Sequence, residues 1–191
     1  MPRGGKSSSE KRLVTGREDE VPMKFEALYL ELIDSTNMIS GLLAGITQEE
    51  AATKPNPESW SMLELLCHLY DEEREDFREH LDFILHRKQE QWHTIEPGAW
   101  VTTRKYNTQN FREMKEKFFA ERSKSLDWLK GLSAADWETS ITNEYGTMLA
   151  GEMFASWVAH DNLAIRQFVE LRRARLERIT APYSIAYAGD W

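Results

Sequence analysis

Residues 60–68 read WSMLELLCH and residues 152–160 read EMFASWVAH, so that an apolar helical run ends in histidine twice in this chain. The two histidines, His68 and His160, hold equivalent positions in two segments of the same pattern. Imidazole nitrogen is the commonest protein ligand for zinc and related transition metals. The repeated pattern predicts two helices whose histidines converge on one metal ion.

The rest of the chain also has the apolar spacing of amphipathic helices, with large side chains three and four residues apart. No segment shows the two-residue alternation that is typical of a strand. The predicted helices run over residues 24–46, from a cap at Ser59 or Ser61 to about 87, over 109–132 and from 148 to about 179. The sequence therefore predicts an all-α chain.

The connections between these helices indicate how the helices are paired. The first and third helices each end at a glycine, Gly45 and Gly131, followed by Thr47 or Ser133, which can cap a short turn. A longer crossover, roughly residues 88–108, separates the two helix pairs. This arrangement predicts a four-helix bundle with a long crossover between its second and third helices.

Composition predicts the domain organisation. A chain of 191 residues with 41% hydrophobic content is large enough for one well-buried core and small for two. Residues 1–22 are rich in glycine, serine and charge, and we expect them to form a disordered tail. We expect residues 23–191 to form a single domain.

Charge and cysteine usage argue against several classes of partner. The formal net charge of −8 disfavours nucleic acid and anionic membranes, because both attract a basic protein surface. No apolar stretch approaches the roughly 20 residues of a membrane span. The single cysteine, Cys67, excludes an intramolecular disulfide, and a reducing cytoplasm is the expected compartment.

The two histidines differ in their expected surroundings. When residues are placed at ~100° intervals around a helix, His160 lies in an apolar stripe with Trp157 and Ala164, and Gln167 shares that face. Two interpretations of His160 follow. It is a metal ligand, or it is a core histidine that is hydrogen-bonded to a backbone carbonyl or to Gln167.

His68 falls outside the apolar arc of its helix, along a line of acidic residues. Glu72 follows it by one helical turn and projects in the same direction, which suits joint coordination of a metal. The alternative interpretation is an ordinary exposed histidine on a solvated acidic face.

Other titratable side chains favour structural roles. Cys67 lies at the edge of the apolar arc and is predicted to be a small buried side chain. Arg122 shares a stripe with apolar residues, which predicts a partly buried ion pair with an acid, and the alternative is an anchor for an anionic substrate. His80, His86 and His93 have no partners at ligand spacing and are predicted to lie on the surface.

Several segments together have the order and spacing of a known family. They are WS at 60–61, LLCHL at 65–69, FFAER at 118–122, GLSAADW at 131–137 and AHDNLAIRQ at 159–167. On these segments the chain resembles the DinB/YfiT-like superfamily of metal-dependent enzymes, over about residues 23–180. The resemblance implies the DinB-like four-helix bundle fold.

In that family three histidines typically hold the metal, one on the second helix and two in a His-Asp-x-x-His-x-x-Gln stretch on the fourth. His68 matches the first histidine, while His160 and Gln167 match the start and the end of that stretch. Ala164 stands where the third histidine is expected. We hypothesise from spacing that Glu72 supplies the third ligand and that Gln167 supports the ligands from outside the coordination sphere.

The resemblance implies a divalent-metal enzyme of the thiol-transferase or hydrolase type, with zinc, nickel or manganese as the metal. It further implies a small-molecule substrate, for which a low-molecular-weight thiol is one candidate, and a homodimer. The competing interpretation is a metal-free member that binds a small molecule or a partner, without catalysis, in a cleft between the second and fourth helices. Ala164 adds weight to that second interpretation, because it leaves the histidine triad of the family incomplete.

Overall fold

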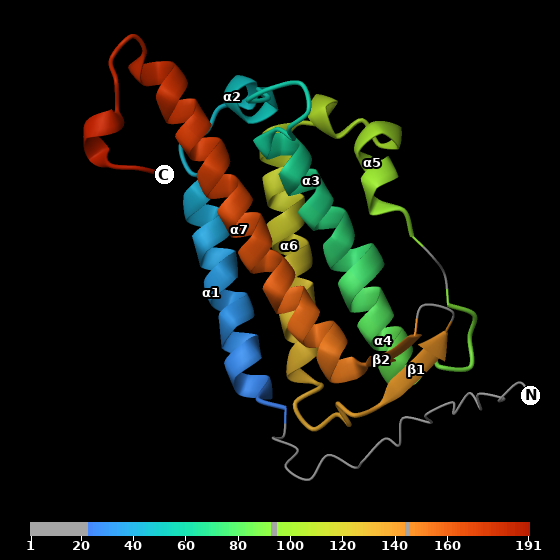
Figure 1. The fold of residues 1–191 in the computed structure, drawn as a ribbon. Helices are drawn as coiled ribbons and strands as arrows, with labels where there is room; N and C mark the ends of the chain where they lie inside the picture. Colours follow the sequence, from blue (N-terminus) through green and yellow to red (C-terminus); the bar gives the residue numbers. More distant parts are fainter. Residues whose placement is uncertain (1–22, 93–94, 144–145) are drawn as a thin grey trace, which may run out of the picture.

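The computed structural model describes residues 23–92, 95–143 and 146–191. The predictions of a disordered tail over residues 1–22 and of a surface position for His93 lie outside the described residues. Within the described part, the chain forms a bundle of long helices (Figure 1). The predicted all-α four-helix bundle is therefore confirmed.

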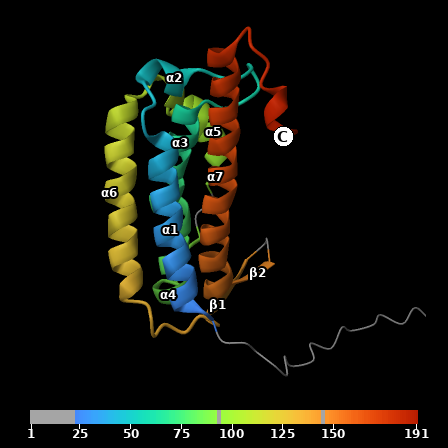
Figure 2. The ribbon, with the colours of Figure 1, turned by 90° about the vertical axis from the view of Figure 1, so that its left-hand side faces the viewer.

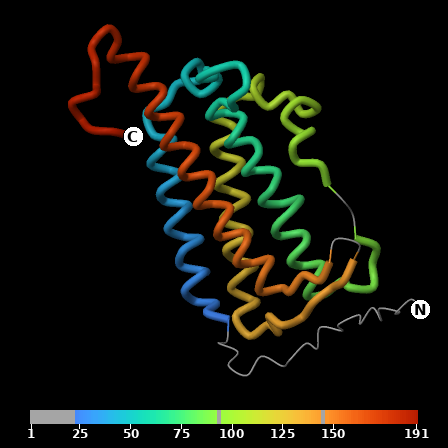
Figure 3. The backbone as a smooth tube through the Cα atoms, in the orientation of Figure 1, coloured from blue at the N-terminus to red at the C-terminus, as the bar shows by residue number. Residues whose placement is uncertain are grey.

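Four long helical segments build the bundle. They are α1 (Phe25–Leu43), the continuous run of α3 (Met62–Glu72), η1 (Glu73–Phe77) and α4 (Arg78–His86), then α6 (Phe111–Lys130) and α7 (Ala150–Thr180). The tube in Figure 3 shows α3 passing into α4 without a break. Viewed from the side, α1, α6, α7 and the α3–α4 run all follow the long axis of the molecule (Figure 2).

Shorter elements connect these helices. The connection after α1 holds α2 (Gln48–Ala52), and the crossover between α4 and α6 holds α5 (Pro97–Thr103) and the 3₁₀ turn η2 (Tyr106–Thr108). A last 3₁₀ turn, η3 (Ala186–Ala188), lies in the segment after α7. The crossover lies between the second and third long helices, as the sequence predicts.

A small β-hairpin departs from the all-helical expectation. Strands β1 (Ser140–Asn143) and β2 (Gly146–Leu149) pair antiparallel, with Thr142 opposite Thr147. Gly146 has φ +123°, a conformation that side-chain-bearing residues rarely adopt. The hairpin is not evident from the sequence, because four residues per strand are too few to show a clear alternation.

A capping box fixes where α3 begins, and α3 carries the first histidine of the repeated pattern. The Ser61 hydroxyl accepts from the backbone N–H of Glu64 at 3.1 Å, and the Glu64 carboxylate accepts from the backbone N–H of Ser61 at 2.8 Å. Ser61 also donates to the Asn107 side chain at 2.6 Å, so the start of α3 is tied to the crossover.

Buried polar side chains lie between two apolar clusters in the bundle. One cluster includes Leu66 and Phe118, and the other includes Phe154 and Trp157. The side chain of Arg122 on α6 is 1% exposed and lies with the buried acids of the neighbouring helices. The predicted ion pair of Arg122 is therefore confirmed, and it is fully rather than partly buried.

None of the helices in the described residues is both long and apolar enough to cross a membrane.

Candidate metal centre

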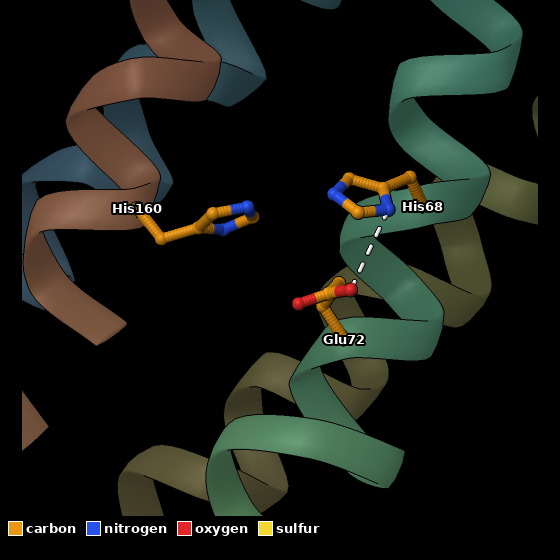
Figure 4. A group of neighbouring side chains, drawn as sticks. All are labelled: His68, Glu72 and His160. Carbon is orange, nitrogen blue, oxygen red and sulfur yellow. Dashed lines mark ion pairs between the residues drawn. The ribbon is translucent and has the colours of Figure 1, made fainter. Parts of the chain in front are cut away.

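Three side chains predicted as metal ligands meet between α3 and α7. His68 and Glu72 project from α3, and His160 projects toward them from α7 (Figure 4). One potential ligand atom of each lies within 4.8 Å of the other two. His68 Nδ1 is 3.7 Å from Glu72 Oε1, and the rings of His68 and His160 have centroids 5.4 Å apart.

The group is largely removed from solvent. The side chains of His68 and Glu72 are 12% and 6% exposed, and His160 is half-buried. His68 Nδ1 and Glu72 Oε1 are buried atoms that have no hydrogen-bond partner among the described residues. A buried polar atom left without a partner costs roughly 1–3 kcal/mol, so both atoms favour an additional partner.

Burial also controls the protonation of this group. Desolvation, with a smaller contribution from His160, lowers the pKa of His68 to about 4. Desolvation likewise lowers the pKa of His160. The pKa of Glu72 is raised to about 9, first by burial and then by the nearby Asp76 carboxyl. At neutral pH both imidazoles are therefore uncharged, which is the form that coordinates metals.

Aromatic rings enclose the two histidines. Trp60 meets the His68 ring edge-on, with centroids 5.0 Å apart, and Phe77 lies 5.1 Å from the His160 ring. Trp157 stacks on Phe77 with an angle of 7° between the rings. These rings limit the access of water to the histidines and raise the effective strength of electrostatic interactions there.

The centre is held by a buried ion-pair network formed by its sequence neighbours. Arg122 donates from Nε and Nη2 to the Glu73 carboxylate, both at 2.8 Å, and from Nη1 and Nη2 to Asp161 at 2.6 and 2.9 Å. Glu73 adjoins Glu72, and Asp161 adjoins His160. One guanidinium thus fixes the spacing between the two helices that carry the candidate ligands.

Gln167 lies apart from the three clustered side chains. It is exposed on α7 and lines a cavity of about 380 Å³ with Trp60, Leu65 and Leu171. Among the described residues no hydrogen bond joins Gln167 to His160, so the structure does not support that version of the core-histidine interpretation. None of the three clustered side chains lines this cavity, and Trp60, whose ring contacts His68, lies between the cavity and the candidate centre.

Ala164, at the position of the missing histidine, is 3% exposed and packs in an apolar core cluster. Cys67 is 1% exposed, and burial raises the pKa of its thiol to about 12, so the predicted small buried side chain is confirmed. His86 is exposed, as predicted.

The prediction for His80 is wrong. His80 is 3% exposed and its Nδ1 lies 2.7 Å from Asp76 Oδ1. Asp76 precedes His80 by four residues on the same helical run, and this spacing is compatible with the pair, but it does not indicate burial because the exposed Asp82–His86 pair shares it.

The donor set fits a divalent metal. Two imidazoles and a carboxylate are the protein ligands of one common class of catalytic zinc site. A tetrahedral zinc ion with bonds of ~2.0–2.2 Å separates its ligand atoms by about 3.3 Å, so small side-chain rotations suffice to bring these atoms to coordinating distance. The two buried atoms without partners, His68 Nδ1 and Glu72 Oε1, would both gain one.

Comparisons with known proteins agree with the observed fold. The family model described as the DinB superfamily matches residues 31–168. The solved structure of YfiT from Bacillus subtilis, described as a probable metal-dependent hydrolase with an unusual four-helix bundle topology, superimposes with a TM-score of 0.70 and 13% identity. That match covers 83% of this chain and 91% of YfiT. No curated protein matches the chain.

Proposed function

The chain belongs to the DinB superfamily, and from this premise we propose that it is a metal-dependent hydrolase of small molecules, with His68, Glu72 and His160 as the metal ligands. The observation that carries the proposal is the pair of buried atoms without partners, His68 Nδ1 and Glu72 Oε1, which face each other 3.7 Å apart. A cation placed among the three side chains gives each of these atoms a partner.

The chain's own residues prepare the site for such a cation. The lowered pKa values of both histidines keep their lone pairs available at neutral pH. Trp60 and Phe77 hold the imidazole rings in place and exclude water. When bound, a divalent metal supplies a Lewis acid that activates a water molecule or polarises a carbonyl group. Zinc suits the donor set best, and nickel and manganese are the alternatives.

The cavity beside Trp60 supports a small-molecule substrate. Its volume of about 380 Å³ lies in the range of ligand pockets, and its walls combine apolar side chains with the Gln167 carboxamide and the Glu170 carboxylate. Trp60 forms part of the cavity wall and contacts His68 with its ring, so a molecule bound in this cavity lies one side chain away from the candidate ligands. In this proposal Gln167 orients the substrate by hydrogen bonding.

A thiol-transferase reaction at the same centre requires a reactive thiol. Cys67 cannot supply the thiol, because it is buried, has its pKa raised to about 12 and donates its S–H to the Tyr106 carbonyl at 3.8 Å. The transferase alternative therefore requires an external low-molecular-weight thiol. Turnover that depends on added thiol would favour the transferase, and turnover without thiol the hydrolase.

We also propose a homodimer that is formed through α1 and α7. These adjacent helices expose large apolar side chains, Leu30 at 56%, Met38 at 44% and Leu163 at 51%. Exposed apolar side chains on neighbouring helices are typical of protein interfaces.

Metal content tests the proposed centre. Protein prepared without a His tag is loaded with zinc, desalted and analysed for its metal, with His68→Ala, His160→Ala and Glu72→Ala alongside. We expect stoichiometric zinc in the wild type and its loss in each variant, because each removes a ligand. His86→Ala, which changes an exposed histidine, serves as the matched control and retains zinc.

Two results would contradict this proposal at different levels. Equal zinc in the wild type and in Glu72→Ala removes Glu72 from the centre and leaves the two histidines. A wild type that takes up no zinc, nickel or manganese, and gains no thermal stability from them, contradicts the centre itself. Hydrolysis of a panel of esters and amides, with and without a chelator, then tests the reaction.

A further inference from the structure

A second acid-imidazole pair lies directly behind the candidate ligand Glu72 on the same helical run. Asp76 and His80 follow Glu72 at four-residue intervals. The His80 ring is buried, and its Nδ1 lies 2.7 Å from Asp76 Oδ1. The Asp76 carboxyl in turn contacts Glu72, whose pKa it helps to raise. Three side chains thus form a continuous polar line that ends at the candidate centre.

The backbone between Glu72 and His80 departs from a regular α-helix. In a regular α-helix, residues four apart drift around the axis by about 40° per step. The segment Glu73–Phe77 is instead a π-helical turn, in which more residues make up each turn, so that its four-residue step falls short of a full turn and offsets the overshoot of the next α-helical step. Within the same turn, Glu73 points to Arg122 in the core. Such π-helical turns are frequent at functional sites.

The far end of the line is fixed by the crossover. The His80 ring stacks on Trp92 with centroids 4.1 Å apart and an angle of 10° between the rings. Trp92 meets Phe83 edge-on at 5.3 Å. The imidazole is therefore held by packing on one side and by Asp76 on the other, which leaves it little freedom to move.

We propose that Asp76 and His80 are positioning residues of the candidate metal centre, with His80 holding Asp76 and Asp76 holding the Glu72 carboxylate toward His68 and His160. This inference rests on the proposed function, because it assigns Glu72 as a ligand. Carboxylates that ligate metals are themselves commonly hydrogen-bonded, and removing such outer partners typically weakens metal binding roughly 10–100-fold.

The chain offers a matched control pair on the same helix. His86 Nδ1 lies 2.8 Å from Asp82 Oδ1, at the same four-residue spacing as in the Asp76–His80 pair. The His86 side chain is 50% exposed, whereas that of His80 is 4% exposed. The two pairs share their spacing and chemistry and differ in burial and in distance from the candidate ligands, so the control shows whether loss of an aspartate-histidine pair on this helical run is enough to weaken metal binding.

Zinc affinity, measured by competition with a chromophoric chelator, tests the proposal. We expect Asp76→Ala and His80→Phe to bind zinc roughly 10–100-fold more weakly than the wild type. His86→Phe keeps the wild-type affinity. Asp76→Asn recovers most of the loss, because a carboxamide can accept from His80 and donate to Glu72.

Cobalt(II) absorption spectra separate positioning from a loss of folding. A displaced Glu72 changes the ligand-field bands of the cobalt-loaded protein, and we expect this change in Asp76→Ala and not in His86→Phe. A spectrum and zinc affinity equal to wild type in Asp76→Ala and His80→Phe overturn the positioning role while the centre stands. A wild type that binds neither zinc nor cobalt overturns the centre and the positioning role together.

Discussion

Adjacent residues on the same helix serve different parts of the molecule. Glu72 and His160 face the candidate centre, whereas the next residue in each case, Glu73 or Asp161, pairs with Arg122. Neighbouring helical positions point about 100° apart, so two acids in succession can serve two sites. The centre and the ion-pair network are therefore mechanically linked through the backbone.

We expect Arg122→Met to lower the free energy of unfolding by about 3–5 kcal/mol, because it leaves two buried carboxylates without their partner. Urea unfolding followed by circular dichroism measures the loss. The control is Arg78→Met, whose partner Glu121 lies nearer the surface, with a smaller expected loss of about 1 kcal/mol. Equal losses in the two variants would contradict the special role of the Arg122 network.

Glu72 makes the stability of the metal-free protein depend on pH. Its pKa is about 9 in the folded protein against an ordinary 4.5, so between these values the folded chain keeps a proton that the unfolded chain has lost. Stability contributed by the protonated carboxyl is complete below pH 4.5 and declines as the pH rises toward 9.

We therefore expect Glu72→Gln, whose side chain does not ionise, to be more stable than the wild type at pH 8 and not at pH 4.5. Thermal melting in the presence of a chelator measures both proteins free of metal. If Glu72→Gln gained the same thermal stability over the wild type at both pH values, packing rather than ionisation would cause the gain.

At the scale of elements, capping boxes decide where two helices start. Thr47 and Glu50 cap α2 on the surface, whereas Ser61 and Glu64 cap α3 in a buried position. Ser61 also donates to Asn107 in the crossover. The start of α3 thus depends on both a local cap and a tertiary contact, and His68 lies two turns further along this helix.

We expect Ser61→Ala to cost about 2 kcal/mol of unfolding free energy and Thr47→Ala about 0.5–1 kcal/mol, since the exposed cap loses less. Chemical denaturation of both variants compares them. If both variants lost a similar small amount of unfolding free energy, the buried hydrogen bond from Ser61 to Asn107 would contribute little to stability.

At the scale of the whole molecule, α1 and α7 offer the face that we propose for dimerisation. A lysine in place of an apolar side chain at the centre of an interface opposes association, because its charge must be buried. We expect a dimer for the wild type and a monomer for Leu30→Lys, as measured by light scattering after size exclusion. Ala120→Lys, on the exposed side of α6, is the control and leaves the dimer intact. A monomeric wild type would contradict the proposal.

The sequence by itself determined the four long helices, the crossover, and the burial of Cys67 and Arg122. These features follow from apolar periodicity and from capping and turn residues, which act over short stretches of chain. The repeated pattern predicted the pairing of His68 with His160, and the resemblance to a known family added the expected third histidine position, which Ala164 occupies.

Only the tertiary structure decided which polar side chains are buried together. His80 looked exposed on its own helix, yet Trp92 of the crossover covers it. Likewise, Glu72 lay on an acidic face in sequence, and the approach of α7 buries it beside His160. Helical periodicity reports the direction of a side chain, whereas burial depends on the element packed against it, which is distant in sequence.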